Sequence, residues 1–152
     1  MGTTLTLLFH SQKSAVIGHV GDSRAYLLRN KKFKQLTSDH SLVAELYRRG
    51  EITESEAINH PQKHVITRAL GISDTVKTDF LAVELADRDL VILCTDGLTN
   101  MVSDTDIALM VQQEGDEQIA AKRLVELANQ RGGHDNITVL LVRFQPDQKE
   151  SR

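Results

Sequence analysis

Three aspartates follow or precede apolar runs, at positions where a folded sheet presents carboxylates at its edge. Asp96 follows the apolar run 90–94 after one intervening residue, Thr95, and Asp22 lies between two apolar runs. Asp135 precedes the apolar run 137–144. Carboxylate oxygens are the ligands that hard divalent cations prefer, and converging carboxylates repel one another unless a cation or a proton neutralises them. The pattern therefore predicts one acidic metal site made of Asp22, Asp96 and Asp135.

Each of these residues also has a simpler interpretation. Aspartate is common in turns because its side chain bonds the nearby backbone, so Asp22 could be a turn residue. Asp96 could cap the next turn, and Asp135 could merely begin a strand. Ser23 beside Asp22 could be a nucleophile, but no activating base is indicated nearby. The spacing of Asp96 and Asp135 favours metal binding for these two residues, whereas Asp22 taken alone is more often a turn residue.

Composition limits the classes of function. The chain has 152 residues and a formal net charge of −3, which predict one globular domain and argue against a nucleic-acid partner. The only cysteine, Cys94, lies in an apolar run and is interpreted as a core thiol. No signal sequence or membrane-spanning run is indicated, so we expect a cytoplasmic protein without a membrane partner.

The hydrophobic periodicity predicts an α+β chain. We expect two helices after the first strands, at 41–49 and after the capping-box pattern 53–56, then two amphipathic helices at 104–113 and 116–131. The polar segment around 60–74, which lies between the first two and the last two of these helices, is interpreted as a flap. Alternating or continuous apolar runs predict strands at 4–9, 14–20, 24–29, 32–35, 78–84, 89–94 and 136–143.

Five motifs occur in an order that resembles a known family. They are GDSRAY at 21–26, SDHSLV at 38–43, VITRALG at 65–71, CTDGLT at 94–99 and GHDNIT at 133–138. In this order the chain resembles metal-dependent protein phosphatases of the protein phosphatase 2C type, particularly the compact bacterial ones. The resemblance extends over 2–144, and the chain is similar to the C-terminal two-thirds of such a phosphatase.

This resemblance implies a fold. We expect a four-layer α-β-β-α sandwich of two antiparallel sheets, incomplete at its N-terminal side, with a phosphatase-like domain at 1–145 and a polar tail at 146–152. The family's first strands, a phosphate-contacting arginine and the early acidic metal ligands have no counterpart here. Unpaired strand edges and uncovered apolar surface would then favour a homo-oligomer.

The resemblance also implies an activity, the hydrolysis of phosphoserine and phosphothreonine in proteins by a metal-activated water, with Mn²⁺ or Mg²⁺ as cofactor. Asp96 and Asp135 match the aspartates that hold the first metal and would be catalytic through its bound water. Asp22 and Asp96 match those that hold an additional, weaker metal. His40 is interpreted as structural, and Arg68 as packing or hydrogen-bonding near the site. Phosphorylated proteins and a cognate Ser/Thr kinase are the implied partners.

Two alternatives stay open. The chain could be a noncatalytic truncated or pseudophosphatase fragment that acts as a binding module. It could also be a calcium or magnesium binding module unrelated to phosphatases.

Overall fold

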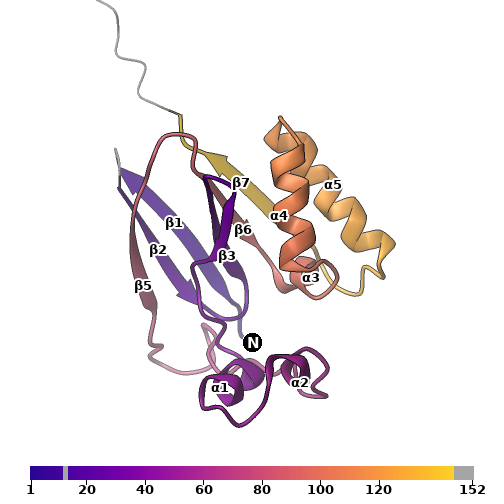
Figure 1. The fold of residues 1–152 in the computed structure, drawn as a ribbon. Coiled ribbons are helices and arrows are strands. Elements are labelled where there is room, and N and C mark those ends of the chain that lie inside the picture. The colour runs from indigo at the N-terminus through magenta and orange to yellow at the C-terminus, as the bar shows by residue number, and fades with distance from the viewer. Residues whose placement is uncertain (12–13, 146–152) are drawn as a thin grey trace, which may run out of the picture.

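The computed structural model describes residues 1–11 and 14–145, which form two antiparallel sheets with helices on one side (Figure 1). One sheet has three strands in the order β1-β2-β5, namely β1 (Leu5–Ser11), β2 (Ser14–Val20) and β5 (Asp79–Glu84). The other has the order β4-β3-β6-β7, namely β3 (Arg24–Arg29), β4 (Lys32–Gln35), β6 (Leu90–Cys94) and β7 (Val139–Arg143). The predicted antiparallel sheets are confirmed.

Two short links decide how the chain passes between strands. Asn30 and Lys31 both have positive φ, at 49° and 65°, the geometry of a tight hairpin turn, and they join β3 to β4 in the same sheet. Residues 21–23 instead carry the chain from β2 in one sheet to β3 in the other. This second link is the one that contains Asp22.

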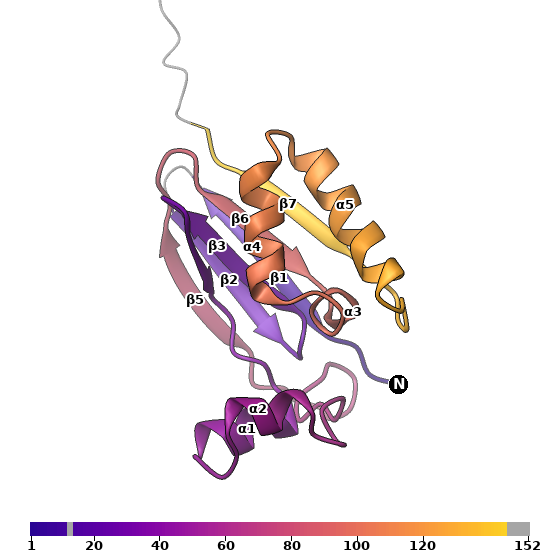
Figure 2. The ribbon, with the colours of Figure 1, turned by 45° about the vertical axis from the view of Figure 1, so that its right-hand side comes forward.

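The hydrophobic core lies between the four-stranded sheet and two helices, α4 (Asp104–Gln113) and α5 (Glu117–Gln130). Ser103 and Asp116 cap these helices by accepting hydrogen bonds from backbone N–H groups of the first turn. Figure 2 shows both helices on the face of this sheet opposite the three-stranded sheet. The core side chains that are at most 2% exposed are Tyr26, Leu90, Ile92, Leu98, Val102, Ile107, Val111, Ala120, Leu124 and Ala128.

Two smaller helices, α1 (Leu42–Arg48) and α2 (Glu54–Ile58), lie beyond one end of the sheets (Figure 1). The predicted capping box of α2 is confirmed, because Thr53 and Glu56 exchange side-chain to backbone hydrogen bonds. Backbone hydrogen bonds from Leu42 to Val65 and from Thr67 to His40 hold this segment to the rest of the chain. The segment 60–74 contains no helix or strand.

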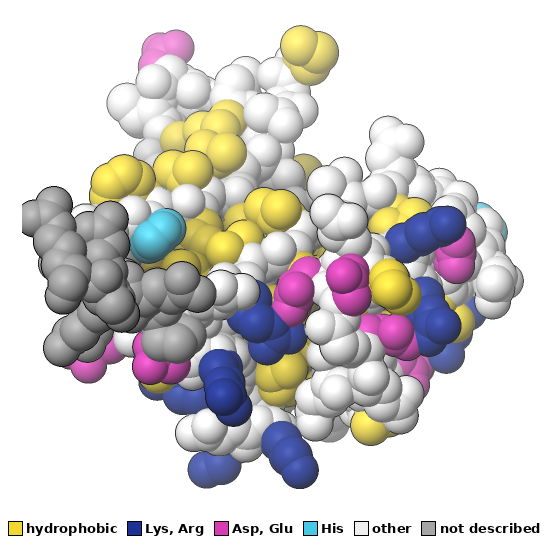
Figure 3. All heavy atoms as spheres, turned by 90° about the horizontal axis from the view of Figure 1, so that it is seen from above, with side chains coloured by type: hydrophobic (Ala, Val, Ile, Leu, Met, Phe, Trp, Pro, Cys, Tyr) yellow, Lys and Arg dark blue, Asp and Glu magenta, His cyan; other side chains and the backbone are white. Residues whose placement is uncertain are grey.

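The outer face of the three-stranded sheet is apolar and exposed. The strand register places Leu5, Leu7, Phe9, Val16 and Phe80 on this face, and they are 40–74% exposed. In Figure 3, hydrophobic side chains gather on the side of the molecule away from α4 and α5. Helices thus cover one outer face of the two sheets among the described residues, in agreement with the expected incomplete sandwich.

Most predicted elements lie where the sequence placed them. The exception is α3 (Asp96–Thr99), a four-residue helix that the sequence analysis did not predict. The proposed polar tail at 146–152 lies outside the described residues. Across the described part of the chain, no helix has the length and apolar character required to cross a membrane.

Candidate metal site

The strand register brings the three predicted aspartates to the same end of the four-stranded sheet. Arg24 at the start of β3 pairs with Cys94 at the end of β6, and Cys94 also pairs with Val139 at the start of β7. Neighbouring antiparallel strands therefore begin and end together at this edge. Asp22 lies two residues before β3, Asp96 two residues after β6, and Asp135 four residues before β7.

The link that carries Asp22 has a backbone shape only glycine accommodates easily. Gly21 has φ of +117°, and a Cβ atom there would lie 2.3 Å from Thr4 Cγ2. The segment around Thr4 consequently packs directly against the link, and Thr4 Oγ1 also lies 3.1 Å from Ser23 Oγ. Asp22 is half-buried in this tight arrangement.

Asp22 and Asp96 act on one another electrostatically. Burial raises the pKa of Asp22 above its usual value, and the negative charge of Asp96 raises it further. Among the ion pairs of the described residues, none includes Asp22 or Asp96. Asp96 receives one side-chain hydrogen bond, from Asn100 Nδ2 at 3.2 Å. The two carboxylates thus form an acidic pair without a bonded cationic side chain.

The loop that carries Asp135 packs against the loop that carries Asp96. Thr95 donates its N–H to Thr138 O at 3.1 Å, and Thr95 Oγ1 accepts from Thr138 N at 3.0 Å. Gly97 approaches the same loop so closely that a Cβ atom there would lie 2.3 Å from Asn136 O. Asp135 itself is exposed, and its Oδ1 accepts from Asn136 N at 2.7 Å.

The three aspartates share one end of the sheet, but they are not drawn into a tight cluster. Within residues 1–11 and 14–145, no group of three or more His, Cys, Asp and Glu side chains is arranged closely enough to hold a metal ion. Asp22 and Asp96 influence one another, whereas the Asp135 carboxylate is bound to its own loop. The ligand set Asp22, Asp96 and Asp135 stays a prediction.

A second group of polar residues surrounds the Asp22 link, and sequence reasoning missed its arrangement. Arg24 donates to both carboxylate oxygens of Asp39, with an Nη2 to Oδ2 distance of 2.7 Å. His40, which is completely buried, contacts Gly21 and Asp79. The motif SDHSLV was the one available signal for Asp39 and His40, whereas nothing in the sequence indicated Asp79.

Asp79 contacts two residues of opposite charge or polarity, His40 and Arg68. Hydrogen bonds from His40 and Arg68, together with the positive charge of Arg68, lower the pKa of Asp79 to about 2. This arrangement confirms the interpretation of His40 as structural and of Arg68 as a hydrogen-bonding residue.

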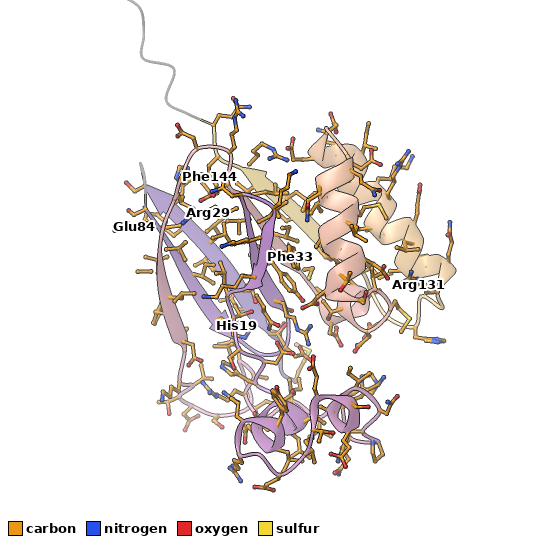
Figure 4. The ribbon with its side chains drawn as sticks, in the orientation of Figure 1. His19, Arg29, Phe33, Glu84, Arg131 and Phe144 are labelled. Atoms are coloured by element: carbon orange, nitrogen blue, oxygen red, sulfur yellow. The ribbon has the colours of Figure 1, made fainter. Side chains whose placement is uncertain are left out.

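Two further residues near these strands, Cys94 and His19, are buried. Cys94 is 5% exposed, as expected of a core thiol, and burial raises its pKa to about 12. His19, which Figure 4 labels in the three-stranded sheet, is 2% exposed. Its Nδ1 lies 3.0 Å from Thr6 Oγ1, while its Nε2 has no partner among the described residues.

Comparison with known proteins gives a consistent family. Residues 1–131 match a family model described as "Protein phosphatase 2C". The chain is 46% identical over 149 residues to "Serine/threonine phosphatase stp" of Listeria monocytogenes, covering 98% of this chain and 59% of that protein. It is 44% identical over 150 residues to "Protein phosphatase PhpP" of Streptococcus pneumoniae, covering 99% of this chain and 61% of that protein.

Solved structures show the same fold. The serine/threonine phosphatase PstP/Ppp of Mycobacterium tuberculosis superimposes with a TM-score of 0.91 at 39% identity, covering 95% of this chain and 61% of that one. A catalytic domain of PstP in complex with two manganese ions superimposes with a TM-score of 0.83 at 38% identity, covering 92% of this chain and 57% of that one. The chain spans about 60% of the length of the relatives it matches.

Proposed function

Because this chain belongs to the protein phosphatase 2C family, we propose that it contributes to metal-dependent hydrolysis of phosphoserine and phosphothreonine in proteins. The observation that carries the proposal is the acidic pair Asp22 and Asp96 at the end of the four-stranded sheet, beside the loop of Asp135. The names of the relatives favour a phosphatase over a noncatalytic binding module.

The side chains at this edge have the chemistry of a site for a hard divalent cation. Asp22, Asp96 and Asp135 offer only carboxylate oxygens, which suit Mn²⁺ and Mg²⁺. The raised pKa of Asp22 reflects burial and repulsion from Asp96, both of which a bound cation would offset. When bound, the cation would supply an acidified water for attack on phosphorus and would neutralise charge on the phosphate.

The residues of this chain have separable roles in the proposal. Asp96 and Asp135 would hold the first cation and thereby act in catalysis, and Asp22 and Asp96 would hold an additional, weaker cation. Thr95 and Gly97 keep the loops of Asp96 and Asp135 in register through their contacts with residues 136–138.

The test is Mn²⁺-dependent hydrolysis of p-nitrophenyl phosphate by the purified 152-residue chain, combined with calorimetric measurement of Mn²⁺ binding. Asp96→Asn removes the carboxylate that two cations share, so it should abolish hydrolysis and reduce Mn²⁺ binding more than Asp22→Asn does. Equal losses of binding in the two variants would contradict the assigned sharing. Binding without hydrolysis in the unchanged chain would favour the binding-module alternative.

Partners and location follow from the same proposal. Phosphorylated proteins would be the substrates, a Ser/Thr kinase would act on the same proteins, and the cytoplasm is the expected compartment. Phosphoprotein hydrolysis can be tested with a ³²P-labelled phosphoserine protein as substrate and Asp96→Asn as the control variant.

We also propose that the isolated chain self-associates through the apolar outer face of the three-stranded sheet. Leu7, Phe9 and Phe80 are 52–74% exposed there, and exposed apolar faces of this kind commonly mark interfaces. Sedimentation equilibrium should show a dimer or larger species that Phe9→Ser with Phe80→Ser reduces to monomer. An unchanged chain that keeps the mass of a monomer at every protein concentration measured would contradict this proposal.

A further inference from the structure

His40 is the residue through which the Asp22 link is joined to the segment 65–70. The side chain is completely buried, at 0% exposure, although histidine is polar. Both of its ring nitrogens have partners: Nδ1 lies 3.1 Å from Gly21 N, and Nε2 lies 3.0 Å from Asp79 Oδ2. A buried polar ring with two partners of this kind is held in one orientation.

The partners fix where the ring proton lies. The backbone N–H of Gly21 can only donate, so Nδ1 of His40 must accept and carries no proton in this arrangement. The proton of the neutral ring is then on Nε2, which donates it to the carboxylate of Asp79. Asp79 accepts a second hydrogen bond on its other oxygen, from Arg68 Nη1 at 2.9 Å.

The backbone of His40 holds the same two segments. His40 N donates to Gly21 O at 2.8 Å, so one residue satisfies both the N–H and the C=O of Gly21. His40 O accepts from Thr67 N at 2.8 Å, in the segment that also carries Arg68. The neighbouring Asp39 binds Arg24 on the other side of the Asp22 link.

Asp22 therefore lies between two residues that are held from outside the link, Gly21 by His40 and Arg24 by Asp39. We propose, as an extension that rests on the proposed function, that His40 is a positioning residue for Asp22. Its bond to the Gly21 N–H directs the Asp22 carboxylate toward Asp96, and the chain His40, Asp79, Arg68 couples this direction to the segment 65–70. His40 does not itself touch the substrate or the cation.

Two substitutions separate the two ring nitrogens. In His40→Asn, the side-chain oxygen stands near the position of Nδ1 and can accept from Gly21 N–H, but the contact with Asp79 is lost. In His40→Gln, the amide reaches the position of Nε2 and can donate to Asp79, but the acceptor for Gly21 is lost. The pair thus keeps the polarity of the position and changes which partner is served.

The first measurement is the tautomer of His40 in the unchanged chain, from the ¹⁵N shifts of the ring nitrogens. We expect the proton on Nε2. A proton on Nδ1 would overturn the inference, because that nitrogen could then not accept from Gly21.

The second measurement is Mn²⁺ binding by calorimetry, with the Asp22-dependent site defined as the binding that Asp22→Asn removes. His40→Gln should weaken this site about tenfold, the lower end of the effect of losing an outer partner of a metal ligand. In His40→Asn, the Mn²⁺ affinity of this site should stay within about twofold of that in the unchanged chain. Thermal unfolding of both variants provides the control for a general loss of structure.

The outcomes distinguish this inference from the function on which it rests. Equal weakening in both variants, or none in His40→Gln, would overturn the positioning role while leaving the metal site intact. Unchanged Mn²⁺ binding in Asp22→Asn would overturn the assignment of Asp22 as a ligand and this inference with it, whereas the proposed function is tested separately by Mn²⁺-dependent hydrolysis and its loss in Asp96→Asn. The tautomer is measured in the unchanged chain, so it tests the inference even where a variant does not fold.

Discussion

Replacing Asp89 by alanine should destabilise the fold strongly, because this carboxylate is buried and bound by three donors. Its side chain is 1% exposed. Arg29 donates to it through Nε at 2.9 Å and Nη2 at 2.6 Å, and Ala86 N donates at 2.8 Å. Arg29 Nη2 also donates to Glu84 O, so the group joins β3 of one sheet to β5 of the other. Figure 4 labels both residues, Arg29 and Glu84.

The magnitude follows from what Asp89→Ala leaves behind. Removing one partner of a buried ion pair typically costs about 3–5 kcal/mol of unfolding free energy. The side chain of Arg29 is 38% exposed and can regain water, which places the loss near the low end, at about 3 kcal/mol. In a chain of this size that loss lowers the melting temperature by about 6–12 °C.

The assay is urea unfolding followed by circular dichroism, with the exposed neighbour Asp87→Ala as the matched control. The control should change the unfolding free energy by about 0.5 kcal/mol or less. A loss in Asp89→Ala within 1 kcal/mol of the control would refute the reasoning that the buried pair holds the two sheets together.

The same pair gives a pH dependence with a definite sign. Burial by itself would raise the pKa of Asp89, but hydrogen bonds from Arg29 and Ala86 outweigh burial and lower the pKa below its usual value. A depressed folded-state pKa contributes stability above the unfolded value, and this stability is lost as the pH falls through the folded-state pKa. The unfolding free energy of the unchanged chain should therefore exceed that of Asp89→Ala by the full amount at pH 7 and by less at pH 3. A difference in unfolding free energy that grew on acidification would contradict the lowered pKa of Asp89.

Two further predictions concern the site and the core. Gly97→Ala should cost about 1–3 kcal/mol and weaken Mn²⁺ binding, because its Cβ would stand 2.3 Å from Asn136 O, whereas Gly115→Ala, with no atom within 4 Å, should be neutral or stabilising by up to about 1 kcal/mol. Urea titrations and calorimetry of both variants test this, and equal effects would count against the close packing of the two loops. The thiol of Cys94, with its pKa raised to about 12, should react slowly with iodoacetamide at pH 8 in the folded chain and rapidly in urea. Fast labelling of the folded chain would show that the thiol is accessible.

The sequence predicted the location of the aspartates well because that location depends on local patterns. Asp22, Asp96 and Asp135 each stand within four residues of a strand, and strands are visible as apolar runs. Once neighbouring strands pair antiparallel, residues just before one strand and just after the next must share an edge. The apolar pattern thus predicted three aspartates at strand ends, whereas their common end also depends on the pairing of β3 with β6 and of β6 with β7.

The support around Asp22 was not predictable in the same way. His40 and Asp79 are 39 residues apart, and their contact depends on β5 pairing with β2, which no local pattern specifies. The helix α3 is too short to show a helical period, so its four residues looked like a loop. The burial of His19 likewise depends on the second sheet and could not be predicted from its own strand.

Strand β3 is fastened at both of its ends to the opposite sheet. At one end Arg29 reaches across to Glu84, and at the other the Asp22 link continues directly into β2. Asp22 and Asp96 therefore belong to different parts of the sandwich, the link between the two sheets and the start of α3 just after β6. A cation held by both would oppose sliding of the sheets along one another, so occupancy of the site would stiffen the whole sandwich against shear.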